Sequence, residues 1–536
     1  MFVDFLKLKK FAVNFFSLAF AVASVTGVIY YIIYPSEAYF HADCTDTILW
    51  AQASYDSGTL FNPDFGYAAM LPFGGTMLML PFIGIFGVSM TTHHIGMVLF
   101  TALLFASAYL LCRSLKFSFS LSMTSLGTFA AVLCASEKLR EIFYEHVIYY
   151  SICVFVIFVL LSLFIKFKES IGEAKIGKLA IITFVAVIFS ACAALDGMQV
   201  IATGVVPVLF AAVAEIFLNG EKKLFSKESR SSFYFCFISG VSVIIGLIFL
   251  SLFDNGVSAS YAGAYSSYAN MNEWLSNLLK FPEQWFALLG VDAYYGMSLF
   301  SVESIVNMIR IAAAVIIAGV PFIALVFYKK FDFGSRLLIL THFGLTAVIM
   351  FGYVFGILSA ANWRLSPMIC SGILVCFATF RTAKEYMVPK RLAALMMCVL
   401  ILMSGISFVT VAGMDKNGAE HNEKYGMIQY LKENNLNYGY ATFWNSQVIT
   451  VLSDSQVRAA NVDVNENGIA PCPYQSNMNW FDEQEGTEKY FVLLSHYEEE
   501  TLMQTADGEY FRTLPIEMHQ IDGYVIYVFD TVDFLH

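Results

Sequence analysis

The chain has 536 residues, of which 58% are hydrophobic, 16% aromatic and only 14% charged. Charged residues alone make up about a quarter of a typical soluble domain, so the composition excludes a soluble globular protein and indicates many membrane spans. The formal net charge of -11 lies mostly in the C-terminal part and in loops, which argues against nucleic acid as a ligand.

Eleven apolar runs are long enough to span a bilayer, which takes roughly 20 apolar residues. They cover residues 11–34, 92–111, 119–135, 147–167, 179–194, 200–218, 233–253, 305–328, 337–358, 365–380 and 392–412. We interpret the first run as an uncleaved helix, because it is too long for a signal peptide and no small-residue cleavage site follows it. An odd number of spans places the two termini on opposite sides of the membrane.

Lysine and arginine concentrate in the cytoplasmic loops of membrane proteins. With the N-terminus inside, the inner loops are rich in both residue types, for example at 166–178, 222–230 and 381–391. The outer loops that precede the C-terminal part hold few: Lys138, Arg140, Lys280, Arg310 and Arg364. This distribution predicts an N-terminus inside and a C-terminus outside.

Two shorter apolar stretches, 70–87 and 281–295, are interrupted by proline and glycine. We expect both to lie along the outer membrane surface, the first as a pair of helices that covers the polar segment before it. After residue 412 the charge rises, and helical signals at 421–434 mix with strand signals at 490–494 and 524–529. The sequence therefore predicts a transmembrane domain over 1–412 and an extracytoplasmic soluble α/β domain over 413–536.

Eight of the ten cysteines lie in apolar runs, and no CxxC or zinc-binding spacing is present. We interpret these eight as small buried side chains. Cys44 and Cys472 lie in polar segments, and whether they pair is open.

The segment 39–58 follows the first span and carries His41, Asp43, Asp46 and Asp56. Asp43 and Asp46 are three residues apart and would share one face of a helix. One of them could cap the helix that runs to Ser57. Two acids and a histidine beside a membrane helix exceed what capping requires, so we interpret this segment as half of an active site.

The second external loop, 136–150, places Glu145 and His146 just before the next span, with Lys138 and Arg140 one to two turns earlier. One interpretation is a solvated loop with aromatic anchors. The other is that Glu145 and His146 face Asp43 across an external cleft, where acids could serve as a proton acceptor or bind a divalent cation.

Three further features have both a structural and a functional interpretation. Asp196 lies in an Asp-Gly pair that suits a tight turn. Arg364 lies in a short external turn, where it either reaches toward lipid headgroups or binds a phosphate with its planar fork. Tyr261 and Tyr265 belong to an aromatic outer loop, which could anchor the protein at the interface or line a substrate groove.

Together these features resemble the GT-C superfamily of integral membrane glycosyltransferases. They are the acidic segment after the first span, the amphipathic stretch behind it, the Pro/Gly-interrupted stretch, the second acidic loop and the C-terminal domain. The resemblance is strongest over 11–167 and is closest to the branch that contains protein mannosyltransferases and lipid A aminoarabinose transferases. The chain lacks a clear Asp-Glu pair at the first motif and any WWDYG-like motif, which argues against an oligosaccharyltransferase.

The resemblance implies a hexosyl- or pentosyltransferase that moves a sugar from a polyprenyl phosphate to an acceptor outside a bacterial plasma membrane. The acceptor would be a cell-envelope glycan, a lipid or a protein. Asp43, or failing it Asp46, matches the acid of the first loop and is the expected general base. Glu145 and His146 match the second motif.

In this interpretation Arg364, supported by Lys138 or Arg140, stabilises the donor phosphate. His41, Asp196, Tyr261 and Tyr265 line the substrate. Magnesium or manganese could bind Asp43 and Glu145, although other branches need no metal.

Two other classes of function stay open. A transporter or flippase for lipid-linked sugars would show charged or broken helices at the membrane midplane, whereas the expected spans are nearly free of charge. A non-catalytic envelope assembly protein would use the C-terminal domain as its binding module.

Overall fold

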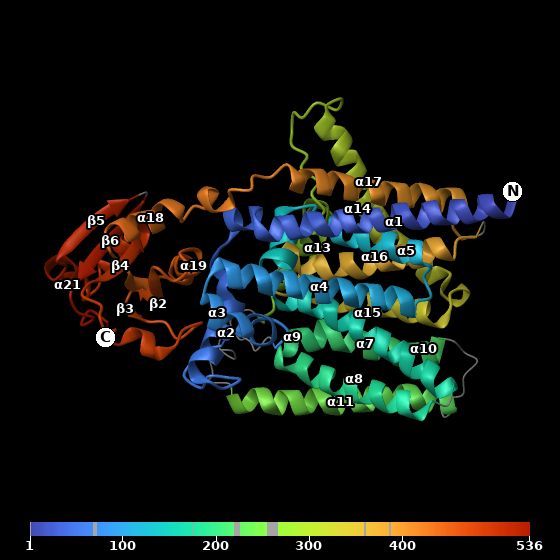
Figure 1. The fold of residues 1–536 in the computed structure, drawn as a ribbon, viewed down its shortest axis with the longest axis horizontal. Helices are drawn as coiled ribbons and strands as arrows, with labels where there is room; N and C mark the ends of the chain where they lie inside the picture. The colour runs from blue at the N-terminus through green and yellow to red at the C-terminus, as the bar shows by residue number, and fades with distance from the viewer. Residues whose placement is uncertain are drawn as a thin grey trace.

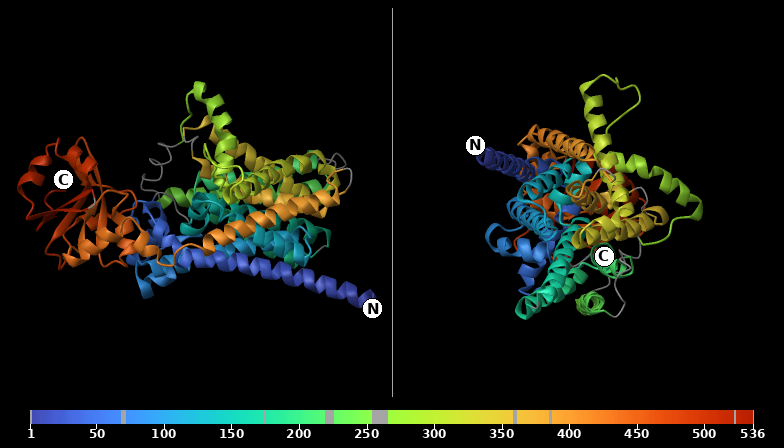
Figure 2. Two further views of the ribbon diagram at one scale, coloured as in Figure 1. Left: turned by 90° about the horizontal axis from the view of Figure 1, so that it is seen from above. Right: turned by 90° about the vertical axis from the view of Figure 1, so that its right-hand side faces the viewer.

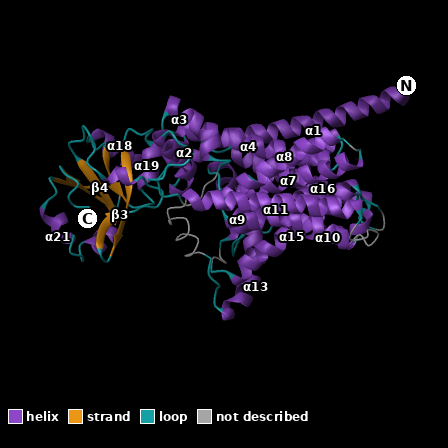
Figure 3. Cartoon of the chain, turned by 90° about the horizontal axis from the view of Figure 1, so that it is seen from below, coloured by secondary structure: helices purple, strands orange, loops and turns teal. Residues whose placement is uncertain are grey.

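The computed structural model describes residues 2–67, 72–173, 175–218, 226–253, 266–357, 361–384, 387–521 and 523–535. A bundle of roughly parallel helices is joined at one end to a small α/β domain, and the N-terminus lies at the other end (Figure 1). The two views in Figure 2 show the same elongated arrangement from above and along the bundle. In the described part of the chain, all strands belong to the domain at the end of the bundle (Figure 3).

Ten helical segments in the described ranges are long and apolar enough to cross a membrane, so the chain is a polytopic helical membrane protein. They are α1 (Phe2–Ile33), α4 (Met90–Ser114), α7 (Tyr149–Gly172), α8 (Ile176–Leu195), α9 with η5 and α10 (Met198–Leu218), α11 (Lys227–Phe253), α14 (Val302–Val326), α15 (Phe333–Phe355), η8 with α16 (Asn362–Arg381) and α17 (Lys390–Ala412).

The run 119–135, expected as one further span, is bent in the structure. Helix α5 (Phe119–Val132) is followed by a helix over Glu137–Glu145 at an angle of 116°. Because a helix rises about 1.5 Å per residue, α5 is too short by itself to cross a hydrocarbon core of roughly 30 Å. The count is therefore ten spans, or eleven if the bent pair is one span.

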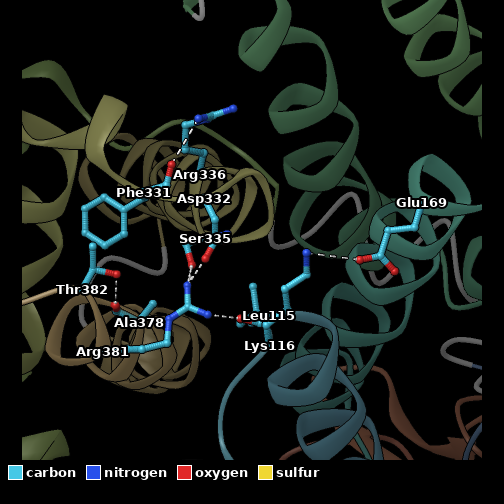
Figure 4. Close-up of polar contacts among 10 residues, drawn as sticks. All are labelled: Leu115, Lys116, Glu169, Phe331, Asp332, Ser335, Arg336, Ala378, Arg381 and Thr382. Carbon is cyan, nitrogen blue, oxygen red and sulfur yellow. Dashed lines mark hydrogen bonds and ion pairs between the residues drawn. The ribbon is translucent and has the colours of Figure 1, made fainter. Parts of the chain in front are cut away.

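Polar contacts connect the helix ends far from the α/β domain (Figure 4). At the end of α16, Arg381 donates to the Leu115 carbonyl and to the Asp332 carboxylate. Lys116 pairs with Glu169 at 3.8 Å. Several loops that the charge distribution assigns to the inner side thus meet at one end of the bundle.

The opposite end, next to the α/β domain, carries several short helices. They are η1 (Pro35–Tyr39), η2 (Ala42–Thr45), α2 (Asp46–Ser57), η3 (Gly75–Met79), α3 (Leu80–Phe86), α6 (Glu137–Arg140), η4 (Glu141–Glu145), η6 (Met271–Glu273) and α13 (Trp274–Leu288). The expected helix pair over 70–87 is one helix, η3 continuing into α3. A Cβ atom at Gly75 would lie 1.9 Å from the Thr47 carbonyl oxygen, so glycine lets η3 pack directly on α2.

Helix α13 covers much of the second interrupted stretch and projects from the side of the bundle (Figure 3). Its exposed side includes Leu275, Leu278 and Leu279. These leucines precede the stretch 281–295, whose expected place along the membrane surface stays a prediction.

The C-terminal domain contains a six-stranded sheet in the order β3-β2-β1-β4-β6-β5. The strands are β1 (Tyr438–Ala441), β2 (Arg458–Asn465), β3 (Gly468–Pro471), β4 (Tyr490–Ser495), β5 (Glu517–Ile521) and β6 (Tyr524–Phe529). Strand β1 is parallel to β2 and β4, and the other pairs are antiparallel. The strands expected at 490–494 and 524–529 are confirmed as β4 and β6.

Helices cover both faces of this sheet. Side chains of α18 (Tyr425–Glu433) and α19 (Ser446–Leu452) pack on one face, and those of α20 (His496–Leu502) and α21 (Gly508–Thr513) pack on the other. Helix α19 makes the crossover between β1 and β2 that a parallel pair requires. The predicted α/β class of this domain is therefore confirmed.

The C-terminal domain is attached to the segment between α1 and α4. Asn422 Nδ2 donates to the carbonyl oxygens of Glu37, at 2.7 Å, and Phe40, at 3.0 Å. The Ser455 hydroxyl donates to the Val88 carbonyl at 2.7 Å. The domain thus holds both ends of the first external segment, which contains the acids expected at the active site.

Candidate active site

A π-helical turn, η4 (Glu141–Glu145), organises the second external loop. Such turns are rare and are frequent at functional sites. The wider turn carries Glu141 and Glu145 into the space beside the first external loop, and His146 follows directly in extended conformation. This local geometry brings the two loops together.

Glu145 is the most buried acid of the group, with 1% of its surface exposed. It accepts a hydrogen bond from the hydroxyl of Tyr31 in α1. The Arg140 guanidinium lies 5.2 Å from the Tyr31 ring centre and 5.8 Å from that of Tyr39. A buried carboxylate needs such a partner, so the Tyr31 hydroxyl holds Glu145 in place, while Arg140 packs on the Tyr31 ring.

His41, Cys44 and Glu145 form a compact group, with one ligand atom of each within 4.8 Å of the others. Imidazole nitrogen, thiolate sulfur and carboxylate oxygen are the ligands that zinc takes in proteins. In the described part of the chain, His41 Nδ1 and Glu145 Oε2 are buried and lack a hydrogen-bond partner. The three residues therefore fit a divalent metal ion. Asp43 and Glu145 were the ligands expected from the sequence, whereas the structure groups Glu145 with His41 and Cys44.

The surroundings of His41 favour a positive charge. Cys44 and, next, the Glu141 carboxylate raise the pKa of the His41 imidazole to about 12, and Glu141 Oε1 lies 3.7 Å from His41 Nε2. A proton on His41 supplies this charge when no metal is bound. A metal ion would replace the proton, because ligand histidines must be neutral.

Asp43 and Asp46 lie next to this group in the first loop. His146 Nδ1 is 3.4 Å from the Asp43 carbonyl oxygen, and burial lowers the pKa of His146, so its imidazole is neutral. Burial and the neighbouring Asp43 raise the pKa of Asp46 well above its ordinary value, which favours its protonated form. Because a protonated carboxyl cannot accept a proton, Asp46 is a poor candidate for the general base of this loop.

Helix capping does not account for these acids. The N-cap residue of α2 is Thr45, and within the described first loop its side chain makes no capping hydrogen bond. Asp46 is the first residue of α2, and its buried Oδ1 has no hydrogen-bond partner among the described residues. Neither acid has the capping role that was the alternative interpretation.

Arg364 and Lys138 lie beside the second loop. Arg364 belongs to η8 (Asn362–Leu365), and Arg364, Trp363 and Gln199 surround the Tyr150 hydroxyl. The Lys138 ammonium lies 5.0 Å from the Trp363 ring centre and pairs with Glu141. Two of the three expected phosphate-binding cations thus gather near Trp363, whereas Arg140 is buried against Tyr31.

Among the described residues, Asp196 makes no contact with this cluster. It follows α8 with 2% of its surface exposed, and both of its carboxylate oxygens are buried without a hydrogen-bond partner in the described part of the chain. Gly197 has a φ of 84°, so the Asp-Gly pair does form a turn that needs glycine. Tyr261 and Tyr265, expected to line the substrate, lie outside the described residues.

The structure adds four residues to the site that the sequence pattern did not single out. Tyr31 lies within an apolar run, Glu141 in a charged loop, and Cys44 had been considered only for a disulfide, whereas both Cys44 and Cys472 are free thiols. His93, at the start of α4, is buried against the Glu145 backbone. Of these four residues, only Glu141 could have been found from the sequence, because it lies four residues before Glu145.

The fold and the site define an integral membrane protein with a polar, partly acidic site where its helical bundle meets an α/β domain. No protein-family model matches the chain, and no curated protein matches its sequence. Its structure is similar to the crystal structure of the Archaeoglobus fulgidus oligosaccharyltransferase in complex with zinc and sulfate. The two share 10% sequence identity at a TM-score of 0.48, over 96% of this chain and 74% of that chain.

Proposed function

We propose that this protein is a membrane glycosyltransferase of the GT-C type. In this proposal it transfers a hexosyl or pentosyl group from a polyprenyl phosphate to a cell-envelope glycan, lipid or protein. The supporting observation is the meeting of the first external loop, with Asp43, and the second, with Glu145 and His146, at one end of the bundle. We expect this end to face the outside of a bacterial plasma membrane.

The residues of the cluster suit the two halves of a glycosyl transfer. The acceptor hydroxyl must lose a proton to a base, and Asp43 is the carboxylate that we assign to this role. The leaving group is a phosphate, which needs charge stabilisation more than a proton. Arg364, with its planar fork, and Lys138 are assigned to the phosphate oxygens.

The buried residues support this chemistry indirectly. The Tyr31 hydroxyl keeps Glu145 oriented toward His41 and Cys44. If this group binds a metal ion, the ion would supply Lewis-acid stabilisation of the phosphate. A thiolate ligand favours zinc over the magnesium or manganese expected from the acids alone.

The distribution of charge favours a reaction at the membrane surface over transport through the bundle. A transporter places its ionisable residues at the membrane midplane. Here the charged residues of α4, α8 and α17 lie only near the helix ends: Arg113, Lys178, and Lys390 with Arg391. The acids, histidines and cations of the candidate active site lie instead at the end next to the C-terminal domain.

The test is a transfer assay with purified protein in lipid nanodiscs. A panel of polyprenyl phosphate sugars is supplied with cell-envelope acceptors, and release of polyprenyl phosphate is measured. We expect Asp43→Asn to lower the rate by about 10² to 10⁴, as is typical for loss of a general base. Asp64→Asn, an exposed residue of the same external segment, is the matched control, and an Asp43→Asn variant with full activity would exclude the assigned role.

A further inference from the structure

A cavity lies between α2, α3 and the C-terminal domain, with a volume of about 280 Å³. Gln52 and Asp56 line it from α2, and Gln447, Arg458 and Trp480 line it from the domain. Pockets for small molecules enclose roughly 300 to 1,000 Å³, so this cavity is at the lower end of the range. It is separate from the residues assigned above to catalysis and donor binding.

Gln447 is a buried polar residue of the cavity lining. It lies in α19 with only 3% of its surface exposed, and its Nε2 has no hydrogen-bond partner in the described part of the chain. Buried side-chain donors are nearly always paired in folded proteins. Gln447 therefore adds a buried amide to the residues that line this cavity.

The other polar groups complement one another in charge. The Gln52 amide donates to Asp56 Oδ1 at 2.5 Å, which orients the carboxylate at one wall. Arg458 begins β2 at the other wall. One carboxylate and one guanidinium leave the lining with no net charge, so a neutral ligand with several hydroxyl groups suits it best.

An aromatic side chain completes the lining. Trp480 is held by an edge contact with Phe65 at 6.0 Å between ring centres, and its carbonyl oxygen accepts the Tyr438 hydroxyl at 2.7 Å. Tyr55 on α2 is 52% exposed and lines the same cavity. Aromatic rings offer a flat apolar face together with a polar edge, which matches a sugar ring with its C–H face and its hydroxyl rim.

From these groups we propose that the cavity binds a neutral saccharide, and, resting on the proposed function, that this saccharide is part of a glycan acceptor. Helix α19 contacts both the cavity, through Gln447, and η2, which contains Asp43. Helix α2 runs from Asp46 beside the active site to Asp56 at the cavity, roughly 15 Å at 1.5 Å per residue. A glycan held here could place a hydroxyl a few sugar units away near Asp43.

The experiment is saturation-transfer NMR on the full chain in detergent, with lactose and N-acetylglucosamine as the probes. We expect signal transfer from the wild-type protein, and at least tenfold weaker binding in Gln447→Met and in Arg458→Met. Gln520→Met, at an exposed position of β5, is the matched control and should bind as the wild type does. Because Arg458 is exposed, the Arg458→Met variant tests the cavity even if Gln447→Met does not fold.

The binding readout separates this inference from the proposed transferase activity. Absence of signal from both sugars, or equal binding by the wild type and Arg458→Met, would overturn the saccharide pocket. Displacement of the sugars by a short serine-containing peptide with higher affinity would overturn it in favour of a peptide site. Sugar binding that depends on Gln447 and Arg458 and is unchanged in Asp43→Asn supports it, whatever the outcome of the transfer assay.

Discussion

The hydroxyl of Tyr31 in the first membrane helix donates a hydrogen bond to the carboxylate of Glu145 in the second external loop, and both side chains are buried. The two residues are 114 positions apart in the chain. This bond joins the helix that leads into the first acidic loop to the turn that carries the second. It therefore fixes the spacing between the two halves of the candidate active site.

Replacing Tyr31 should destabilise the site. Tyr31→Phe removes the donor and leaves Glu145 buried with a further unpaired oxygen, a change that costs about 1–3 kcal/mol. We expect a lower unfolding temperature of the purified protein, measured by intrinsic fluorescence during heating. Tyr34→Phe, at a position that is 46% exposed, should not change the unfolding temperature, and equal effects of the two variants would argue against a role for the hydrogen bond.

Metal binding should depend on Cys44. Loss of the thiolate leaves His41 and Glu145 as the remaining ligands of the group, so we expect Cys44→Ser to weaken zinc binding at least tenfold. The measurement is zinc content after dialysis against a competing chelator, determined by mass spectrometry. Cys472→Ser removes another buried free thiol and should retain the wild-type zinc content; a wild-type protein that retains no zinc would contradict the assignment.

The donor phosphate should bind more tightly to arginine than to lysine at position 364. Arg364→Lys keeps the charge but loses the planar fork that binds two phosphate oxygens together. We expect about tenfold weaker binding of a polyprenyl phosphate, measured by competition with a fluorescent analogue in nanodiscs. Arg512→Lys, on the exposed surface of the C-terminal domain, is the control, and unchanged binding in Arg364→Lys would remove Arg364 from the donor site.

Attachment of the C-terminal domain should weaken as pH rises. Burial and, next, Asp454 raise the pKa of Glu37 above its ordinary value. The folded protein therefore keeps a proton on Glu37 that the unfolded chain releases at lower pH, so this contribution to stability is complete below about 4.5 and is lost as pH rises through the raised pKa.

Unfolding temperatures between pH 4 and pH 8 test this expectation. Glu37→Gln cannot ionise and should show a smaller decline in unfolding temperature with rising pH than the wild type. Glu420→Gln, at an exposed position nearby, should follow the wild-type profile. Parallel profiles for Glu37→Gln and the wild type would show that Glu37 does not titrate in this way.

Several features of the fold follow from local properties of the sequence. The apolar runs predicted nearly all of the spans, because the length and hydropathy of a run decide whether it can cross a bilayer. The short, continuous apolar and β-prone runs at 490–494 and 524–529 were sufficient to predict β4 and β6. The run 119–135 is the exception among the predicted spans. Its length did not reveal the bend that turns residues 137–145 toward the first loop.

By itself, the sequence determined the class of protein and the two loops in which acids gather at one end of the spans. Only the tertiary structure decided which side chains meet there: Tyr31 with Glu145, and His41 with Cys44. The same holds for the cavity under the C-terminal domain, whose walls come from residues near 50 and near 450. Hydropathy is read along the chain, whereas these contacts depend on how helices far apart in sequence pack, which no local pattern records.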